Sequence, residues 1–196
     1  RFVRHHGERP RPRPAQGQGA VAVRPHYSRH QTGPGHLCRR RPSGSAQLTP
    51  MPGSFRFLDD IALADMAFDA EGESLPALFE AATQALIESL ADPVTIAETW
   101  RHSVDMEEAD IETLLFEWLG RLVYLKDAQG VVFHRATLSL NQNDAHTAWH
   151  LHAELTGAPV DPATQDLRSD VKGVTKHLYA VTLEGISWKA RVVLDV

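Results

Sequence analysis

The stretch KARVVLDV, residues 189–196, indicates that this chain contains a β-sheet with one face covered by other elements. Its apolar residues, and the tryptophan before it, recur at every second position: Trp188, Ala190, Val192 and Leu194. This period of two is typical of a β-strand that buries one face and exposes the other. Asp195 falls on the opposite face, beside the terminal carboxylate of Val196, and two adjacent anions repel each other unless a cation lies between them. The stretch therefore predicts a half-buried strand with a candidate cation site at its end.

Two amphipathic helices are predicted to cover the buried face of such strands. In EGESLPALFEAATQALIESLADP (71–93), Ser74 can cap the helix and Pro76 lies in its first turn. In DIETLLFEWLGRLVYLKDAQG (110–130), Gly130 is the stop signal. The predicted inward positions are Leu75, Leu78, Phe79, Ala82, Leu86 and Leu90 in the first helix, and Ile111, Leu114, Leu115, Trp118, Leu119, Leu122 and Leu125 in the second. Each set forms one apolar stripe, so each helix should pack on one side.

The remaining periodic segments predict strands. They are 55–58 at a sheet edge, 66–70, 94–104, a hairpin of 131–140 and 147–155, and part of 169–185 before the terminal strand. Strands outnumber helices, and both helices are single-sided. The economical architecture is therefore an α+β two-layer sandwich, with a mixed β-sheet and the two amphipathic helices packed on one face.

The first 50 residues differ in composition from the rest. They hold ten of the 20 basic residues, all arginine, one of the 25 acidic residues (Glu8) and seven of the 12 prolines. Such a segment has no hydrophobic period and cannot bury enough apolar surface to offset its ordering entropy. We expect residues 1–50 to be a disordered or spurious N-terminal extension, and 51–196 to be a single domain that begins at Met51. A transit peptide is the alternative, because the segment is rich in arginine and poor in acids, although its prolines disfavour an amphipathic helix.

The predicted domain is strongly acidic. Residues 51–196 keep 10 basic and 24 acidic residues, a formal net charge of −14. This charge disfavours direct, tight binding to nucleic acid and favours cations or a protein partner with a basic face. The single cysteine, Cys38, precedes the domain, which suits a reducing compartment, and no apolar run approaches the roughly 20 residues that cross a bilayer. We expect a cytoplasmic protein without membrane contact.

Histidines in HTAWHLHAEL (146–155) have the spacing of a metal pair. Strand alternation places Trp149, Leu151, Ala153 and Leu155 inward, and His146, His150, His152 and Glu154 on the other face. A solvated strand face explains these residues without a metal, and we favour that interpretation. Lys172 and His177 in VKGVTKH (171–177) have the pattern of surface residues, and no catalytic motif accompanies them.

Acidic residues lie at the ends of two predicted strands. Asp65 starts the strand that contains Met66 and Phe68, and Asp195 ends the last strand. If these strands are neighbours, Asp65, Asp195 and the Val196 carboxylate converge at one edge of the sheet. Ligation by oxygen alone favours a hard cation, Ca²⁺ or Mg²⁺. Aspartates also end many strands without binding an ion, so the spacing alone leaves both interpretations open.

Taken together, these stretches resemble the archease family. The matching segments are FRFLDDIALADMAF (55–68), SLPALFEAATQAL (74–86), LLFEWLGRLVYLKD (114–127), DVKGVTKH (170–177) and LDV (194–196). Each motif is weak alone. The specificity comes from finding all five in the family's order, between residues 55 and 196.

The resemblance implies a small α+β protein that is not itself an enzyme. Archeases assist the RtcB-type RNA ligase, which joins 3′-phosphate (or cyclic phosphate) and 5′-hydroxyl RNA ends in tRNA splicing and RNA repair. They promote guanylylation of the ligase's histidine, allow repeated turnover and bind a divalent cation, for which we expect Ca²⁺ with Mg²⁺ as the alternative. Carried over by position, the cation ligands would be Asp65, Asp195 and Val196, and the functionally important residues would be Lys172 and His177.

The chain departs from the family pattern at two places. The family opens with D-H-T-A-D, whereas this chain has DDIALAD (59–65), so Asp60 is an alternative to Asp65; we favour Asp65 because it starts the strand. Lys176 replaces the tyrosine of the family's V-K-A-x-T-x-H segment, which adds a positive charge near the site. Two other functions stay open: a small metal-dependent hydrolase that uses the same carboxylates with His177, and a metal-free acidic binding module.

Overall fold

The computed structural model describes residues 52–58 and 65–196, and of Asp65 the backbone only. The predicted boundary at Met51 lies outside these residues. The elements follow in the order β1 (Ser54–Leu58), β2 (Asp65–Gly72), α1 (Leu75–Leu90), the 3₁₀ turn η1 (Pro93–Thr95), β3 (Trp100–Glu108), α2 (Ile111–Gln129), β4 (Val131–Gln142), β5 (Trp149–Pro159), β6 (Gly173–Glu184) and β7 (Ser187–Asp195). Neither helix in this part of the chain is long and apolar enough to cross a membrane.

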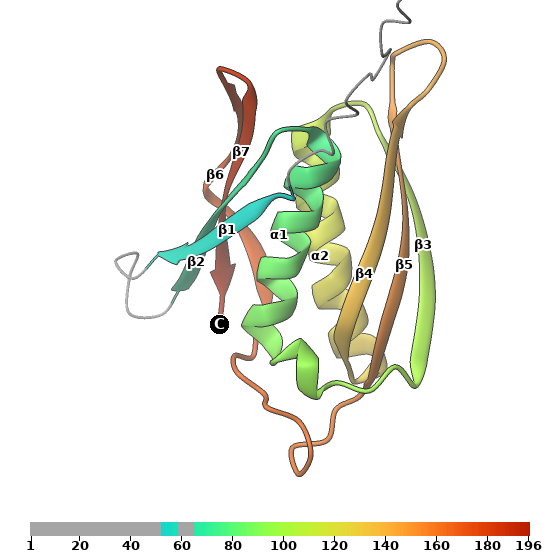
Figure 1. Ribbon diagram of the computed structural model, residues 1–196, viewed down its shortest axis with the longest axis vertical. Coiled ribbons are helices and arrows are strands. Elements are labelled where there is room, and N and C mark those ends of the chain that lie inside the picture. Colours follow the sequence, from blue (N-terminus) through green and yellow to red (C-terminus); the bar gives the residue numbers. More distant parts are fainter. Residues whose placement is uncertain (1–51, 59–64) are drawn as a thin grey trace, which may run out of the picture. The chain divides into compact units, whose positions relative to one another are not determined.

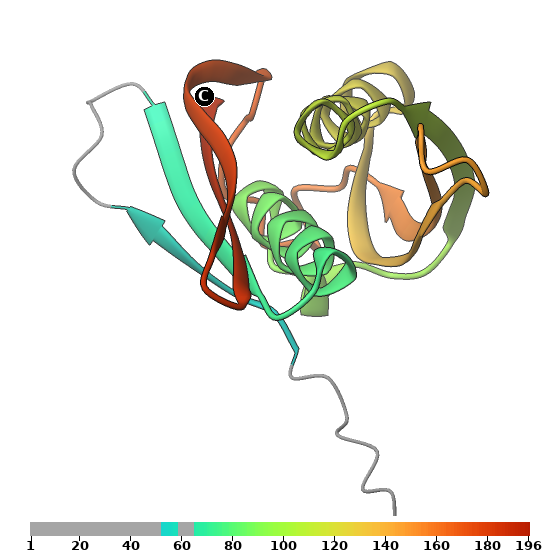
Figure 2. The same ribbon diagram turned by 90° about the horizontal axis from the view of Figure 1, so that it is seen from above.

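The strands form two antiparallel sheets with the helices between them (Figure 1, Figure 2). One sheet has the strand order β1-β2-β7-β6, and the other has the order β3-β5-β4. Helix α1 packs against β2 and β4, and α2 packs against β6 and β3, so each helix contacts both sheets. The predicted α+β sandwich is confirmed. The strands, expected in one mixed sheet, instead divide between two sheets whose pairs are all antiparallel.

The sequence of α1 explains why the helices are covered on two sides. Besides the predicted stripe, Ala77, Ala81, Ala85 and Ile87 are buried. A helix that is apolar around most of its circumference has to be covered on more than one side. The stripe predicted for α1 left out these residues, and with them the second sheet.

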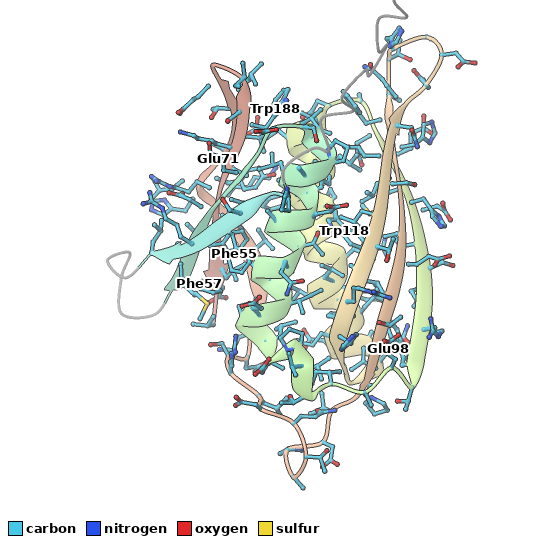
Figure 3. All side chains as sticks on the ribbon, in the orientation of Figure 1. Phe55, Phe57, Glu71, Glu98, Trp118 and Trp188 are labelled. Carbon is cyan, nitrogen blue, oxygen red and sulfur yellow. The ribbon has the colours of Figure 1, made fainter. Side chains whose placement is uncertain are left out.

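The helix ends and inward faces confirm the predicted pattern. Ser74 accepts a hydrogen bond from the first turn of α1, and Gly130 ends α2 in the left-handed conformation, with φ of 62°. The predicted inward residues of both helices are buried, except that Ile111 is partly buried. Trp118 of α2 lies in this interior (Figure 3), and its indole Nε1 donates a hydrogen bond of 2.8 Å to Thr83 Oγ1 of α1. This bond joins the two helices inside the core.

The strand predicted over 94–104 is wrong at its start. Residues Pro93–Thr95 form η1, and β3 begins only at Trp100. Asp92 caps the turn, because its Oδ1 accepts a hydrogen bond of 3.1 Å from the Val94 amide. The other predicted strands form within a few residues of their expected bounds, with β1 at a sheet edge as expected.

Candidate cation site at the ends of β2 and β7

The ends of β2 and β7 meet as the sequence predicts. The two strands pair antiparallel, and their register sets Asp65 directly opposite Asp195. In such pairs the Cα atoms of opposed residues lie about 4.5–5.5 Å apart. The predicted convergence is therefore confirmed for the backbone. Asp60 and the side chain of Asp65 lie outside the described part of the chain, so the choice between them as ligand stays a prediction.

Strand β6 brings Lys172 to the same place from the other side of β7. Gly173 is the register partner of Asp195, and the Lys172 amide donates a hydrogen bond of 2.7 Å to the main-chain oxygen of Asp195. Both Lys172 and Asp195 are exposed. The end of β7 thus lies between a strand that begins with an aspartate and a segment that carries a lysine.

Val196 fixes this end of the chain against the interior. Its side chain is partly buried and packs on the main hydrophobic core, whereas that of Asp195 is exposed. Leu194, before them, is fully buried. The inward positions predicted for the terminal strand are confirmed for Ala190, Val192 and Leu194, although Val193 on the opposite face is also fully buried. Asp195, on the same face as Val193, is exposed.

The segment before β6 is tied to the end of α1. The main-chain amides of Arg168 and Ser169 donate hydrogen bonds to the carbonyls of Leu90 (2.9 Å) and Ser89 (3.0 Å). Val171, two residues later, is fully buried. These contacts carry the chain across the end of α1 and into β6 at Lys172.

Lys126 ties the same segment to α2, a contact that sequence reasoning missed. Its Nζ lies 2.7 Å from Asp170 Oδ1 and 2.8 Å from Asp127 Oδ1. Burial alone would lower the pKa of Lys126, but its hydrogen bonds to the two carboxylates hold that pKa above the ordinary value. The hydrogen bond from Lys126, with the nearby charge of Lys172, lowers the pKa of Asp170. The sequence did contain a signal for this contact. Lys126 follows Leu122 by four residues, which places it on the inward face of the helix, where a lysine needs a partner.

His177 is not aligned with this site. Strand β6 bulges between Thr175 and Ala180, so the residues inside the bulge have no register partner on β7. His177 is exposed, and its main-chain amide donates a hydrogen bond of 3.1 Å to Thr175 Oγ1. Leu178 has a φ of 56°, which is rare for leucine. The hydrolase alternative, which needs His177 beside the carboxylates, gains no support from this placement.

The bulge is held on α2 instead. Tyr179 Oη donates a hydrogen bond of 2.7 Å to the Glu112 carbonyl, and its ring meets the Phe116 ring edge-on with centroids 5.2 Å apart. Burial raises the pKa of Tyr179. Lys176 Nζ lies 5.2 Å from the centroid of Phe116, within cation–π range. The lysine that departs from the family pattern therefore contacts α2.

His150 and His152 lie on the exposed face of β5, as predicted. They face carboxylates of β3: His152 Nδ1 is 2.8 Å from Asp105 Oδ1, and His150 Nε2 is 3.7 Å from Glu107 Oε2. Across residues 52–58 and 65–196, no three His, Cys, Asp or Glu side chains are grouped so as to hold a metal ion. The histidine pair fits the solvated-face interpretation.

The donors expected at the ends of β2 and β7 suit a hard cation. They would be the carboxylates of Asp65, Asp195 and Val196, all oxygen ligands of the kind that Ca²⁺ and Mg²⁺ take. Among the described residues, no Lys, Arg or His side chain forms an ion pair with Asp195. The exposed Asp195 carboxylate is thus available for an external cation.

Comparison with known proteins identifies relatives of the same length as the folded region. Residues 55–196 match the model of the "Archease protein family (MTH1598/TM1083)". The chain is 27% identical to protein archease of Methanosarcina barkeri, over 72% of this chain and 95% of the relative, and 29% identical to protein archease of Methanothermobacter thermautotrophicus, over 72% and 98%. The solution structure of Methanobacterium thermoautotrophicum protein 1598 is similar, with a TM-score of 0.61 and 27% identity over 73% of this chain and 99% of that one.

Proposed function

The chain belongs to the archease family, and on that basis we propose that it is a non-catalytic activator of an RtcB-type RNA ligase. The activator would promote guanylylation of the ligase's histidine and sustain repeated turnover, during tRNA splicing and RNA repair in the cytoplasm. The observation that carries the proposal is the register that sets Asp65 opposite Asp195 in a chain of this family. The joining of 3′-phosphate and 5′-hydroxyl RNA ends would remain the chemistry of the ligase.

In this proposal a divalent cation, Ca²⁺ or alternatively Mg²⁺, is held by Asp65, Asp195 and the Val196 carboxylate. The bound ion would supply a fixed positive charge where carboxylates otherwise repel one another. Asp195 and Lys172 are both exposed, which suits a site presented to a partner protein. Lys172, whose amide bonds to the Asp195 carbonyl, would present its ammonium at the same edge of the sheet.

The charge of the folded region supports a partner-mediated role. With a formal charge of −14, residues 51–196 repel nucleic acid phosphates, so contact with RNA would be made by the ligase. We expect no submicromolar affinity of this protein alone for tRNA at about 150 mM salt. Such an affinity would contradict a role exerted through the ligase.

The direct test combines this protein with an RtcB-type RNA ligase. Guanylylated ligase formed per minute, and RNA joined per ligase, are measured with and without this protein. Both quantities should rise when it is present, and the ligase alone should stop after few turnovers. If neither quantity changes, the protein is not an activator of that ligase.

The choice of ligand on the N-terminal side is tested by calorimetric Ca²⁺ titration of two matched variants. Asp65→Asn should abolish binding because it removes a carboxylate opposite Asp195, whereas Asp60→Asn should bind as the wild type does. The reverse result would assign the site to Asp60. Loss of binding in both variants would indicate that both aspartates contribute.

A further inference from the structure

Lys126 occupies a position that lysine rarely takes. Only 10% of its side chain is exposed, although lysines are seldom buried unless they are paired. It continues the inward stripe of α2 after Trp118 and Leu122, both fully buried. Its ammonium lies beside two carboxylates, so the buried charge is compensated on both sides.

The contacts of Lys126 with Asp127 and with Asp170 join different parts of the chain. Asp127 is the next residue of α2, so that contact ties the helix only to itself. Asp170 lies 44 residues further along the chain, at the point where it turns into β6. Two residues after Asp170, the Lys172 amide reaches the Asp195 carbonyl at 2.7 Å. The ion pair therefore joins α2 to the segment that borders the candidate cation site.

We propose that Lys126 is a positioning residue for the candidate cation site: by holding Asp170 it fixes the main chain from 170 to 173, and with it the approach of Lys172 to Asp195. The preceding residues are already bonded to the end of α1, so Lys126 supplies the anchor from the second helix. That this placement serves ligase activation rests on the function proposed above. Asp170 also lies close enough to Lys172 for their opposite charges to interact.

Hydrogen exchange of the Lys172 amide, measured by NMR on the full chain without added cation, tests the placement directly. Lys126→Met keeps an apolar stem at this buried position and removes the charge, and Asp170, with 79% of its side chain exposed, can be solvated by water. Exchange of the Lys172 amide should rise about ten-fold in Lys126→Met, because its local opening becomes easier, while the amides that join β3 to β5 keep their wild-type rates. Lys126→Arg should retain slow exchange.

The matched control is Lys189→Met, which breaks an ion pair of 2.6 Å with Glu184 near the other end of β7. Its Lys172 amide should exchange at the wild-type rate. Unchanged exchange of that amide in Lys126→Met overturns the proposal. A uniform rise over all amides also overturns it, because that pattern reports a loss of global stability without a local effect.

Calorimetric Ca²⁺ titration connects the placement to the site. Lys126→Met should bind Ca²⁺ roughly three- to ten-fold more weakly than the wild type, since groups that orient ligands tune affinity without touching the ion. Wild-type affinity together with faster exchange would overturn the role of Lys126 at the cation site. If the wild-type protein neither binds Ca²⁺ nor stimulates the ligase, the proposed function fails, while the exchange measurement still decides whether Lys126 positions Lys172.

Discussion

Both sheets bury one face against the same two helices, and on the other face of each sheet an aspartate contacts nitrogen groups of a neighbouring strand. On the sheet β3-β5-β4, carboxylates of β3 face histidines of β5 pair by pair, as in Asp105 with His152. On the sheet β1-β2-β7-β6, Asp69 in the middle of β2 accepts two hydrogen bonds from Arg191 of β7, at 2.8 and 3.0 Å, and a third from Arg56 of β1, at 3.1 Å. Acidic residues in both places thus have a nitrogen partner across the strands.

The end of the second sheet breaks this pattern. Four residues before Asp69, the same pair of strands sets Asp65 opposite Asp195. Like charges directly opposite each other destabilise a pair of strands. Asp69 and Asp105 have nitrogen partners within the chain, whereas Asp65 and Asp195 are placed in register with each other, an arrangement that fits the cation site proposed above. The comparison therefore separates a carboxylate with partners inside the chain from the pair that we propose holds a cation.

The largest expected effect comes from removing one aspartate of that register pair. Saturating Ca²⁺ should stabilise the wild type by about 2.7 kcal/mol at a hundred times Kd, and Asp195→Asn should abolish the resulting rise in unfolding midpoint. In a chelator, the variant should be at least as stable as the wild type, because the repulsion between opposed carboxylates is gone. Thermal unfolding with and without Ca²⁺ measures both effects.

The control for this prediction lies on the other sheet. Asp105→Asn removes a carboxylate that faces His152 at 2.8 Å, and the Ca²⁺ response should stay as in the wild type. If Ca²⁺ stabilises Asp195→Asn as much as the wild type, Asp195 is not a cation ligand. Loss of the response in Asp105→Asn would move the cation to the histidine face, against the comparison.

A smaller effect is expected at Asp69, where the partners are arginines of the chain itself. Asp69→Asn should lower the free energy of unfolding by about 1–2 kcal/mol at pH 7, because two charge-assisted contacts across three strands are weakened. Ca²⁺ should stabilise this variant as much as it stabilises the wild type. Urea unfolding in the presence and absence of Ca²⁺ checks both statements, and a lost Ca²⁺ response would extend the cation site into the sheet.

The pH dependence of this contribution follows from the same contacts. The hydrogen bond from Arg191, with further contributions from Arg56, holds the pKa of Asp69 below its ordinary value of 3.8. A carboxyl whose pKa is lower in the folded state stabilises the fold above the unfolded pKa and loses that contribution as the pH falls through the folded pKa. The stability difference between wild type and Asp69→Asn should therefore be constant above about pH 5 and shrink below about pH 4. A difference that is unchanged at pH 3 would contradict this assignment.

The sequence predicted the elements of the fold from local periodicity. The meeting of Asp65 with Asp195 was predicted only on the condition that the first and last strands are neighbours, which the pairing of β2 with β7 fulfils. Alternation at every second residue defines the faces of β5 and β7, and capping residues such as Ser74 and Gly130 mark the helix ends. The division into two sheets depended on how the second apolar face of α1, which includes Ala81 and Ile87, is covered, and the predicted stripe did not include that face. Spacing along the chain predicts which residues share a face within one element, but not which strands are neighbours.

What the sequence did not predict came from contacts between distant elements. The ion pair of Lys126 with Asp170 joins a helix to a segment without regular structure, and no periodic pattern links two such residues. The bulge in β6 shifted His177 out of register, so its place depended on the packing of Tyr179 against α2. Both features modify the surroundings of Lys172, which the sequence could only identify as a member of a motif.

The smallest expected effect concerns the histidine face. The contact between His152 Nδ1 and Asp105 Oδ1 is 2.8 Å long, but 47% of the histidine side chain and 80% of the aspartate side chain are exposed. Exposed pairs are screened by solvent, so a double-mutant cycle with His152→Gln and Asp105→Asn should give a coupling free energy of only about 0.2–1 kcal/mol. Neither single variant should alter guanylylation of the ligase, because the face is satisfied within the chain and lies on the sheet away from β7. Urea unfolding of the four proteins and the guanylylation assay measure these quantities. A coupling free energy well above that range would mean that this exposed pair stabilises the fold substantially. A loss of ligase stimulation in either variant would mean that the histidine face takes part in the function, contrary to the comparison.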